Sequence, residues 1–159
     1  MKLKEAKTIA ETVRTTLIPH CDRVEIAGSI RRGKPIVHDI DIVIMPKPEA
    51  SLVLDSLIAS MGAVELNGPK TKRLRLPQDN ITIDIYLATP ATWATLLLIR
   101  TGSKENNIRL CSLARRKGWY LKANGDGLID HRGNRVAGDS EEDIYKALGI
   151  PYQKPQERG

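Results

Sequence analysis

The stretch Asp39-Ile40-Asp41-Ile42-Val43-Ile44 decides the fold, because it places carboxylates and branched apolar side chains in strict alternation. Successive side chains of a β-strand point to opposite faces, so the pattern predicts a strand with isoleucines against a core and both aspartates on the other face. Residues 81–87 repeat the alternation and carry a third carboxylate, Asp84. Carboxylates this close repel each other unless a divalent cation neutralises them, which favours a metal site. Three solvated aspartates on an open sheet face are the alternative.

A glycine-containing turn, Gly28-Ser29-Ile30-Arg31-Arg32-Gly33, follows an alternating segment that includes Val24 and Ile26. Backbone N–H groups freed by glycine, a hydroxyl and guanidinium groups are all suited to binding a triphosphate. On its own, the fragment is equally typical of a simple strand exit with solvated arginines. Combined with the three aspartates, it favours phosphate chemistry.

Hydrophobic periodicity predicts further elements on both sides of these motifs. Helices are expected over residues 4–18, 51–61, 92–100 and 106–117 and after residue 140, and strands around residues 24–26, 39–45, 64–66, 73–76, 81–87 and 119–121. Pro90 ends the last long strand pattern, which predicts two lobes, residues 1–90 and 91–159. The expected fold class is α+β: a mixed β-sheet backed by two helices and a small α/β carboxy-terminal lobe.

Charge and composition favour a polyanionic partner and a cytoplasmic location. The net charge is +6, and residues 91–159 carry 12 Lys and Arg against 8 Asp and Glu. No apolar run of the ~20 residues that span a bilayer and no signal-peptide pattern occur, so no membrane contact is expected, and the nucleoid is the expected site in a prokaryote. Cys21 and Cys111 lack metal-ligand spacing.

Several basic residues are candidates for contacts with a nucleic-acid backbone. They are Lys72, Arg73, Arg109, Arg115 and Arg116. A solvated basic face is the alternative for each of them. His38, before the first aspartate, is interpreted as a hydrogen-bonded structural residue rather than a phosphate contact.

The order of the motifs resembles the polymerase beta-like nucleotidyltransferase superfamily, through Gly28-Ser29-x-Arg31-Arg32-Gly33, Asp39-x-Asp41 and Asp84. In the second lobe, Thr101-Gly102-Ser103-Lys104-x-x-Asn107-Ile108 and Asp139-Ser140-Glu141-Glu142-Asp143-Ile144 resemble the carboxy-terminal part of family X DNA polymerases. The resemblance covers essentially the whole chain. It is to the compact members that consist of a palm and a carboxy-terminal lobe, so no lyase activity is expected.

The resemblance implies a role for each matched residue. Asp39 and Asp41 would bind two Mg²⁺ ions, and Asp84 would bind the catalytic ion and help activate the primer 3′-hydroxyl; Mn²⁺ would substitute for Mg²⁺. The implied nucleotide-binding residues are Gly28, Ser29, Arg32, Gly102, Ser103 and Asn107. The implied reaction moves a nucleoside monophosphate from a nucleoside triphosphate to a DNA 3′-hydroxyl. Primer-template or gapped DNA would be the substrate, in short-gap repair. The protein would act as a monomer, and a separate repair partner would supply further contacts with DNA.

Two other functions remain open. A template-independent or small-substrate nucleotidyltransferase, including the toxin–antitoxin type, shares the Gly-Ser and Asp-x-Asp signature, although the Thr101-Gly102-Ser103 lobe argues against it. A non-catalytic DNA-end-binding module would be expected to have an incomplete set of carboxylates.

The chain departs from the family pattern at two places. Ile99-Arg100 stand where many relatives have two aromatic residues, and Cys111 stands where many have an arginine. The first departure predicts weak selection against ribonucleotides, because an arginine side chain is long and mobile and does not crowd the ribose as an aromatic ring does. The second leaves template reading open.

Overall fold

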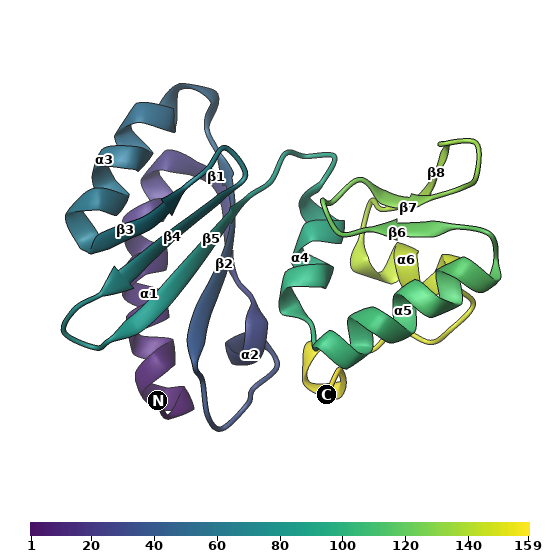
Figure 1. Ribbon diagram of the computed structural model, residues 1–159, viewed down its shortest axis with the longest axis horizontal. Helices are drawn as coiled ribbons and strands as arrows, with labels where there is room; N and C mark the ends of the chain where they lie inside the picture. The colour runs from purple at the N-terminus through teal and green to yellow at the C-terminus, as the bar shows by residue number, and fades with distance from the viewer.

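The computed structural model describes all residues 1–159 and contains two lobes side by side (Figure 1). The first lobe is built on a five-stranded sheet in the order β1-β2-β5-β4-β3. β2 and β5 run parallel, whereas the other neighbours are antiparallel. Its elements are α1 (Leu3–Leu17), η1 (Ile18–His20), β1 (Cys21–Ile26), α2 (Gly28–Arg31), β2 (Asp39–Pro46), η2 (Pro48–Ala50), α3 (Ser51–Met61), β3 (Ala63–Asn67), β4 (Thr71–Leu76) and β5 (Ile81–Leu87).

The second lobe is helical around a small antiparallel sheet in the order β6-β7-β8. Its elements are α4 (Trp93–Thr101), α5 (Lys104–Arg116), β6 (Tyr120–Lys122), β7 (Gly127–Ile129), β8 (Arg135–Ala137), α6 (Glu141–Ala147) and η3 (Pro155–Glu157). Leu98, Leu110, Leu128, Ile144 and Tyr145 belong to its buried core. None of the helices of the protein combines the length and apolar character needed to cross a bilayer.

The main core lies between one face of the five-stranded sheet and helices α1 and α3. α1 contributes buried residues at Ala6, Ala10, Val13 and Leu17, one helical turn apart, and α3 contributes Leu54 and Ile58. The sheet contributes the isoleucines of the alternating strands, Ile40, Ile42, Ile44, Ile83 and Ile85. Because the isoleucines face the helices, the aspartates between them face the opposite side. The predicted α+β class and the two helices behind the sheet are confirmed.

The aspartate-bearing face is only partly open, which differs from the prediction. Helix α4 crosses the carboxyl-terminal end of this face, where Trp93, Leu96 and Leu97 pack against Val43 and Tyr86. The next residue of the same helix, Leu98, packs into the core of the second lobe. Helix α4 therefore joins the two cores and brings the second lobe over the aspartates.

The predicted elements occur with small differences at their ends. Helix α5 begins two residues earlier than predicted, at Lys104, because the Ser103 hydroxyl accepts a hydrogen bond from the Asn106 N–H and caps it. Ser140 caps α6 in the same way, but the Asp143 carboxylate accepts from the N–H groups of Gly138 and Asp139 instead of completing a capping box. Strands β7 and β8 were not predicted, since each has only three residues, too few to show an alternation.

A buried ion network fixes the two lobes to each other. Arg31, in α2 of the first lobe, donates to both carboxylate oxygens of Glu141 at 2.8 Å. Arg158, near the end of the chain, donates to the same carboxylate at 2.9 Å and is 2% exposed. Burial raises the pKa of the Glu141 carboxyl and the two arginines lower it, with a net decrease. The shared carboxylate therefore remains ionised and holds α2, α6 and the carboxy-terminal segment together.

Candidate active site

The three predicted aspartates lie on one face of two neighbouring strands. In the parallel pair of β2 and β5, Asp41 is the direct register partner of Asp84. Asp39 precedes Asp41 by two residues and so shares its face. The strand pairing therefore places Asp84 beside Asp41, although the two are 43 residues apart in the sequence.

The Asp84 carboxylate forms an ion pair with an arginine from the adjacent strand. Arg73 on β4 is its register partner and forms a two-point ion pair, from Nε to Oδ1 at 2.7 Å and from Nη2 to Oδ2 at 3.2 Å. The Asp84 residue is 4% exposed, so without a cation it depends on this guanidinium for its charge balance. No group of three acidic, histidine or cysteine side chains converges on one point. The shared metal ligation by Asp39, Asp41 and Asp84 stays a prediction.

Asp41 is held in an electrostatically unfavourable position. Burial raises the pKa of its carboxyl to about 7, with further contributions from the charges of Asp39 and Asp84. A hydrogen bond from the Tyr86 hydroxyl to Asp41 Oδ1, at 3.3 Å, and the charge of Arg100 act in the opposite direction. The charged form of Asp41 is therefore costly in this position, and a divalent cation bound to the carboxylate would stabilise it.

The Gly28 turn lies directly against Asp41. Gly28 has a φ of 59°, and a Cβ at this position would overlap the Asp41 carboxylate. Glycine is therefore required for both conformation and close approach. The turn places Ser29 and Arg32 beside the carboxylates, as the sequence predicts.

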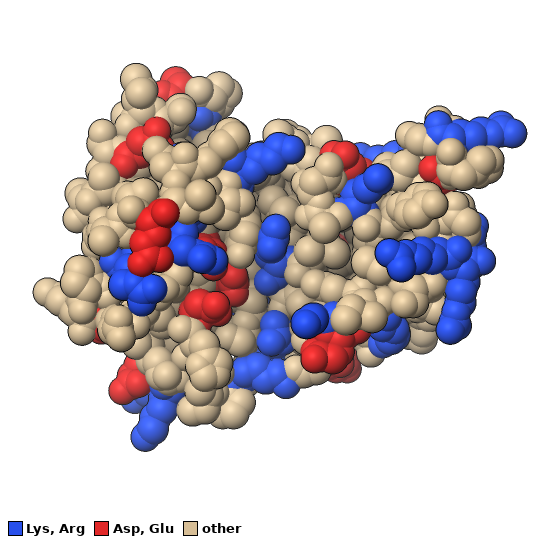
Figure 2. All heavy atoms as spheres, in the orientation of Figure 1, with Lys and Arg blue, Asp and Glu red and all other residues tan.

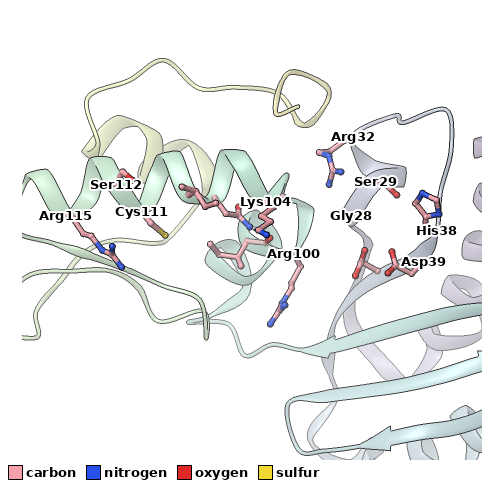
Figure 3. Close-up of a pocket in the computed structure, with 15 residues that line it drawn as sticks. Gly28, Ser29, Arg32, His38, Asp39, Arg100, Lys104, Cys111, Ser112 and Arg115 are labelled. Atoms are coloured by element: carbon pink, nitrogen blue, oxygen red, sulfur yellow. The ribbon is translucent and has the colours of Figure 1, made fainter.

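A cavity of about 670 Å³ opens between the two lobes in front of Asp39 and Asp41. Its walls come from both lobes: the Gly28 turn and β2 on one side, and the end of α4 with one face of α5 on the other (Figure 3). Lys and Arg side chains gather along this groove next to acidic side chains of the first lobe (Figure 2). The lining residues are Gly28, Ser29, Arg32, His38, Asp39, Asp41, Ile99, Arg100, Gly102, Lys104, Asn107, Ile108, Cys111, Ser112 and Arg115. Asp84 is not among them.

Five of the six predicted nucleotide-binding residues line this cavity, and Ser103 does not. The Ser103 hydroxyl donates to the carbonyl of Arg158 and caps α5, so it is 6% exposed and already used within the protein. Asn107 donates from Nδ2 to the Ile99 carbonyl at 2.8 Å, and its Oδ1 has no partner. Because this oxygen is buried, a contact of Asn107 with a nucleotide base stays a prediction.

The Gly102 turn lies against Arg32. Gly102 has a φ of 69°, and a Cβ there would come within 3.1 Å of Arg32 Nη1, which donates to the Thr101 carbonyl. The peptide bond between Gly102 and Ser103 is cis. Arg32 of the first lobe therefore contacts the turn that leads into α5.

The five DNA-binding candidates lie in different surroundings. Lys72 is 8% exposed and pairs with Asp55 at 2.7 Å, and Arg73 pairs with Asp84, so neither is free on the surface. Arg109 is exposed and donates to Gln153 at 2.9 Å. Arg115 lines the cavity, and Arg116 is exposed beside it on α5. Of the five, Lys72 alone is buried, Arg73 is exposed but paired with Asp84, and contact with DNA stays a prediction for all of them.

Comparisons with known proteins agree with this arrangement. Residues 96–159 match the family described as the DNA polymerase beta thumb. The chain is 32% identical to DNA polymerase lambda of Rattus norvegicus, in an alignment of 159 positions that includes 82% of this chain. The chain belongs to the family X DNA polymerases. A second family X relative, DNA polymerase/3′-5′ exonuclease PolX of Bacillus subtilis, is 27% identical over 141 residues and 87% of the chain.

The chain spans about a quarter of the length of these curated family X polymerases, 28% of the rat protein and 25% of the bacterial one. Its fold matches polymerase beta of Leishmania infantum in a ternary P/T complex, with a TM-score of 0.82, 24% identity and coverage of 100% of this chain and 76% of that one. In a ternary gap complex of the same polymerase, the TM-score is 0.79 at 24% identity, with coverage of 99% and 70%. The structural likeness establishes the fold.

Sequence reasoning missed three residues of the candidate site in this family X polymerase. Tyr86 contacts Asp41, and its position two residues after Asp84 in an alternating strand was a usable signal for the same face. Arg100 was interpreted as a mobile side chain, yet its guanidinium stacks on the Tyr86 ring at 4.2 Å. His38, interpreted as structural, is exposed and lines the cavity without a hydrogen bond to the protein.

Proposed function

We propose that the chain carries a nucleotidyl-transfer site that adds nucleoside monophosphates to a DNA 3′-hydroxyl, in the manner of a DNA polymerase. The observation that carries the proposal is the pairing of Asp41 with Asp84 on parallel strands, with Asp39 beside them, at a cavity shared by both lobes. Membership in the family X DNA polymerases supports the same reaction.

The carboxylates fit a pair of Mg²⁺ ions, and Mn²⁺ would substitute. Oxygen donors are the ligands that such hard cations prefer, and a bound cation would stabilise the charged form of Asp41, which burial first and then Asp39 and Asp84 disfavour. Asp39 and Asp41 would hold both ions, and Asp84 would hold the catalytic one. When bound, two ions supply the charge that stabilises the attacking and leaving oxygens of an in-line displacement.

The chain's own residues have separable tasks in this proposal. Gly28, Ser29 and Arg32 bind the triphosphate from the first lobe, and Gly102 and Asn107 border the sugar and base from the second. Asp84 accepts the proton of the primer 3′-hydroxyl once Arg73 releases it. Ser103 acts by capping α5, and it therefore positions Asn107 instead of touching the nucleotide.

DNA is the proposed partner, as primer-template or gapped duplex. The Leishmania infantum polymerase beta structures with this fold are a ternary P/T complex and a ternary gap complex, which supports this choice. We also propose residues 1–90 as a palm and residues 91–159 as a thumb-type lobe. Short-gap repair, a monomeric state, a separate repair partner and a cytoplasmic location stay predictions.

Primer extension tests the proposal directly. The chain is incubated with Mg²⁺, or with Mn²⁺, and one nucleotide at a time on single-stranded, blunt and one-nucleotide-gapped DNA. We expect extension that follows the template base and is strongest on the gap. Asp84→Ala is the inactive control, and Asp79→Ala removes a carboxylate from an exposed turn away from the cavity.

Each outcome separates the proposal from its alternatives. Extension of single-stranded ends regardless of the template would support a template-independent transferase. Binding of DNA ends with no extension under either metal would support a non-catalytic module and contradict the proposal. Equal activity of the wild type and Asp84→Ala would show that these carboxylates are not the reaction centre.

A further inference from the structure

Four arginines, Arg31, Arg32, Arg100 and Arg115, lie close to the cavity, and they differ in how many of their donors are used. Arg31 donates to both oxygens of Glu141 and to the Thr101 hydroxyl, so it is fully engaged in joining the lobes. Arg32 donates to the Thr101 carbonyl, which leaves part of its guanidinium free. Arg100 lines the cavity and makes no hydrogen bond or ion pair within the protein, and its Nε is buried without a partner. Arg115, on α5, also lacks a partner within the protein but is exposed, whereas Arg100 is half-buried. Arg100 is therefore the enclosed arginine of the cavity whose guanidinium makes no hydrogen bond within the protein.

Arg100 is nevertheless held in place. Its guanidinium lies over the ring of Tyr86 at 4.2 Å, and the Tyr86 hydroxyl donates to Asp41. Stacking on an aromatic face fixes the plane of a guanidinium while its N–H donors at the edge remain available. The terminal nitrogens of Arg100 make no hydrogen bond or ion pair within the protein, so their N–H groups can donate to a ligand in the cavity. Figure 3 shows Arg100 extending from the second lobe into the space across from Asp39.

The charge of the cavity selects the kind of ligand. Four cationic side chains, Arg32, Arg100, Lys104 and Arg115, line it against two carboxylates, Asp39 and Asp41. The two carboxylates are assigned to cations in the proposed function, which leaves all four cationic groups to face an anion. A planar guanidinium with free edge donors matches the oxygens of a phosphate group.

We propose that Arg100 is a nucleotide-binding residue that contacts the phosphates of the incoming nucleoside triphosphate from the second lobe, opposite Ser29 and Arg32. The inference rests on the proposed function, since it assumes that the cavity takes a nucleotide. It replaces the interpretation of Arg100 as a mobile side chain that merely leaves room for a ribose. When Arg100 contacts the phosphates, residues of both lobes bind the triphosphate.

Equilibrium binding without DNA tests the proposal, because no turnover then interferes. Calorimetry measures the affinity of dATP and of inorganic tripolyphosphate, each with Mg²⁺ and with a chelator. Arg100→Met keeps the length of the side chain and removes its charge, and we expect it to weaken both ligands by about 10-fold or more, as for a lost hydrogen bond to a charged group. Arg100→Lys should recover part of the loss, because it restores the charge without the fork.

Arg132→Met is the matched control. Arg132 lies in the exposed turn between β7 and β8, away from the cavity, and its loss changes the net charge by the same amount. We expect its affinities to equal those of the wild type, which would exclude a general electrostatic effect. Thermal melts establish that each variant is folded, and if Arg100→Met is not, the comparison rests on Arg100→Lys.

The outcomes distinguish this inference from the proposed function. A wild type that binds neither ligand contradicts both. A wild type that binds dATP, with unchanged affinity in folded Arg100 variants, overturns only the role of Arg100. Weaker dATP binding with unchanged tripolyphosphate binding also overturns it, because the contact would then be with the sugar or base. A parallel loss for both ligands supports it.

Discussion

Replacing Asp41 by asparagine should stabilise the metal-free protein at neutral and alkaline pH. Asparagine has nearly the same shape as aspartate and keeps an oxygen that accepts the Tyr86 hydrogen bond. It removes only the charge, which burial and the neighbouring carboxylates Asp39 and Asp84 make costly. Active-site residues often reduce stability in this way, and the structure allows the size of the effect to be worked out.

The magnitude follows from the difference between two pKa values. Burial, with Asp39 and Asp84, raises the pKa of Asp41 from 3.8 to about 7. The unfolded chain therefore loses this proton near pH 4, while the folded chain keeps it until about pH 7, so stability falls as the pH rises between these values. A difference of about three pH units corresponds to about 4 kcal/mol. Solvent that reaches the carboxylate from the cavity reduces this, and we expect about 2–4 kcal/mol above pH 7.5.

Urea denaturation at a series of pH values, in the presence of a chelator, measures this difference. The free energies of unfolding of wild type and Asp41→Asn should nearly coincide below about pH 4. They should then diverge up to pH 7 and remain parallel above it. Adding Mg²⁺ should reverse the order at high pH, because the cation stabilises only the protein that retains the carboxylate.

Asp79→Asn is the control, because Asp79 is exposed in the turn between β4 and β5. It should follow the wild type at every pH. An Asp41→Asn variant that is less stable than the wild type at pH 8, or that differs by a constant amount from pH 4 to pH 8, would refute the electrostatic reasoning.

Three further predictions concern the reaction. Asp84→Ala should abolish primer extension while dATP binding persists, because Asp84 lies outside the nucleotide cavity; calorimetry beside an extension assay checks both. DNA affinity should fall steeply with salt, because each phosphate contact adds about −0.9 to the slope of the logarithm of the binding constant against the logarithm of the salt concentration. A salt titration of binding to gapped duplex that shows no dependence would contradict this. Discrimination against ribonucleotides should be weak, and Ile99→Tyr/Arg100→Phe should increase the deoxy-to-ribo ratio of insertion efficiencies by roughly 10- to 100-fold. Taking the ratio cancels any loss of phosphate binding, and strong rejection of ribonucleotides by the wild type would exclude this reasoning.

The sheet and its aspartates could be predicted from sequence because a strand has an exact two-residue period. Ile40 and Ile42 must face the opposite side from Asp39 and Asp41, whatever the rest of the chain does. The glycine turn could also be placed, since it follows an alternating segment. These features depend on local geometry alone, which a sequence specifies well.

The second half of the site depends on contacts between distant segments, and no local pattern encodes them. Arg73 was assigned to DNA because its register with Asp84 depends on the exact turn between β4 and β5. The position of Arg100 depends on how α4 crosses the sheet over Tyr86. The Ser103 hydroxyl donates a hydrogen bond to the carbonyl of Arg158, which lies 55 residues further along the chain.

Both ends of the chain are attached to segments that border the cavity, which matters for protein engineering. The Met1 ammonium donates to the Val37 carbonyl at 3.1 Å, immediately before His38 in the cavity wall, and the Arg158 carbonyl accepts from Ser103 next to Gly102. A tag or reporter fused directly to either terminus would pull on a wall of the cavity. The exposed turns at residues 77–80 and 131–134 have no such attachment, so a fluorophore or a linker can be introduced there without disturbing the walls of the cavity.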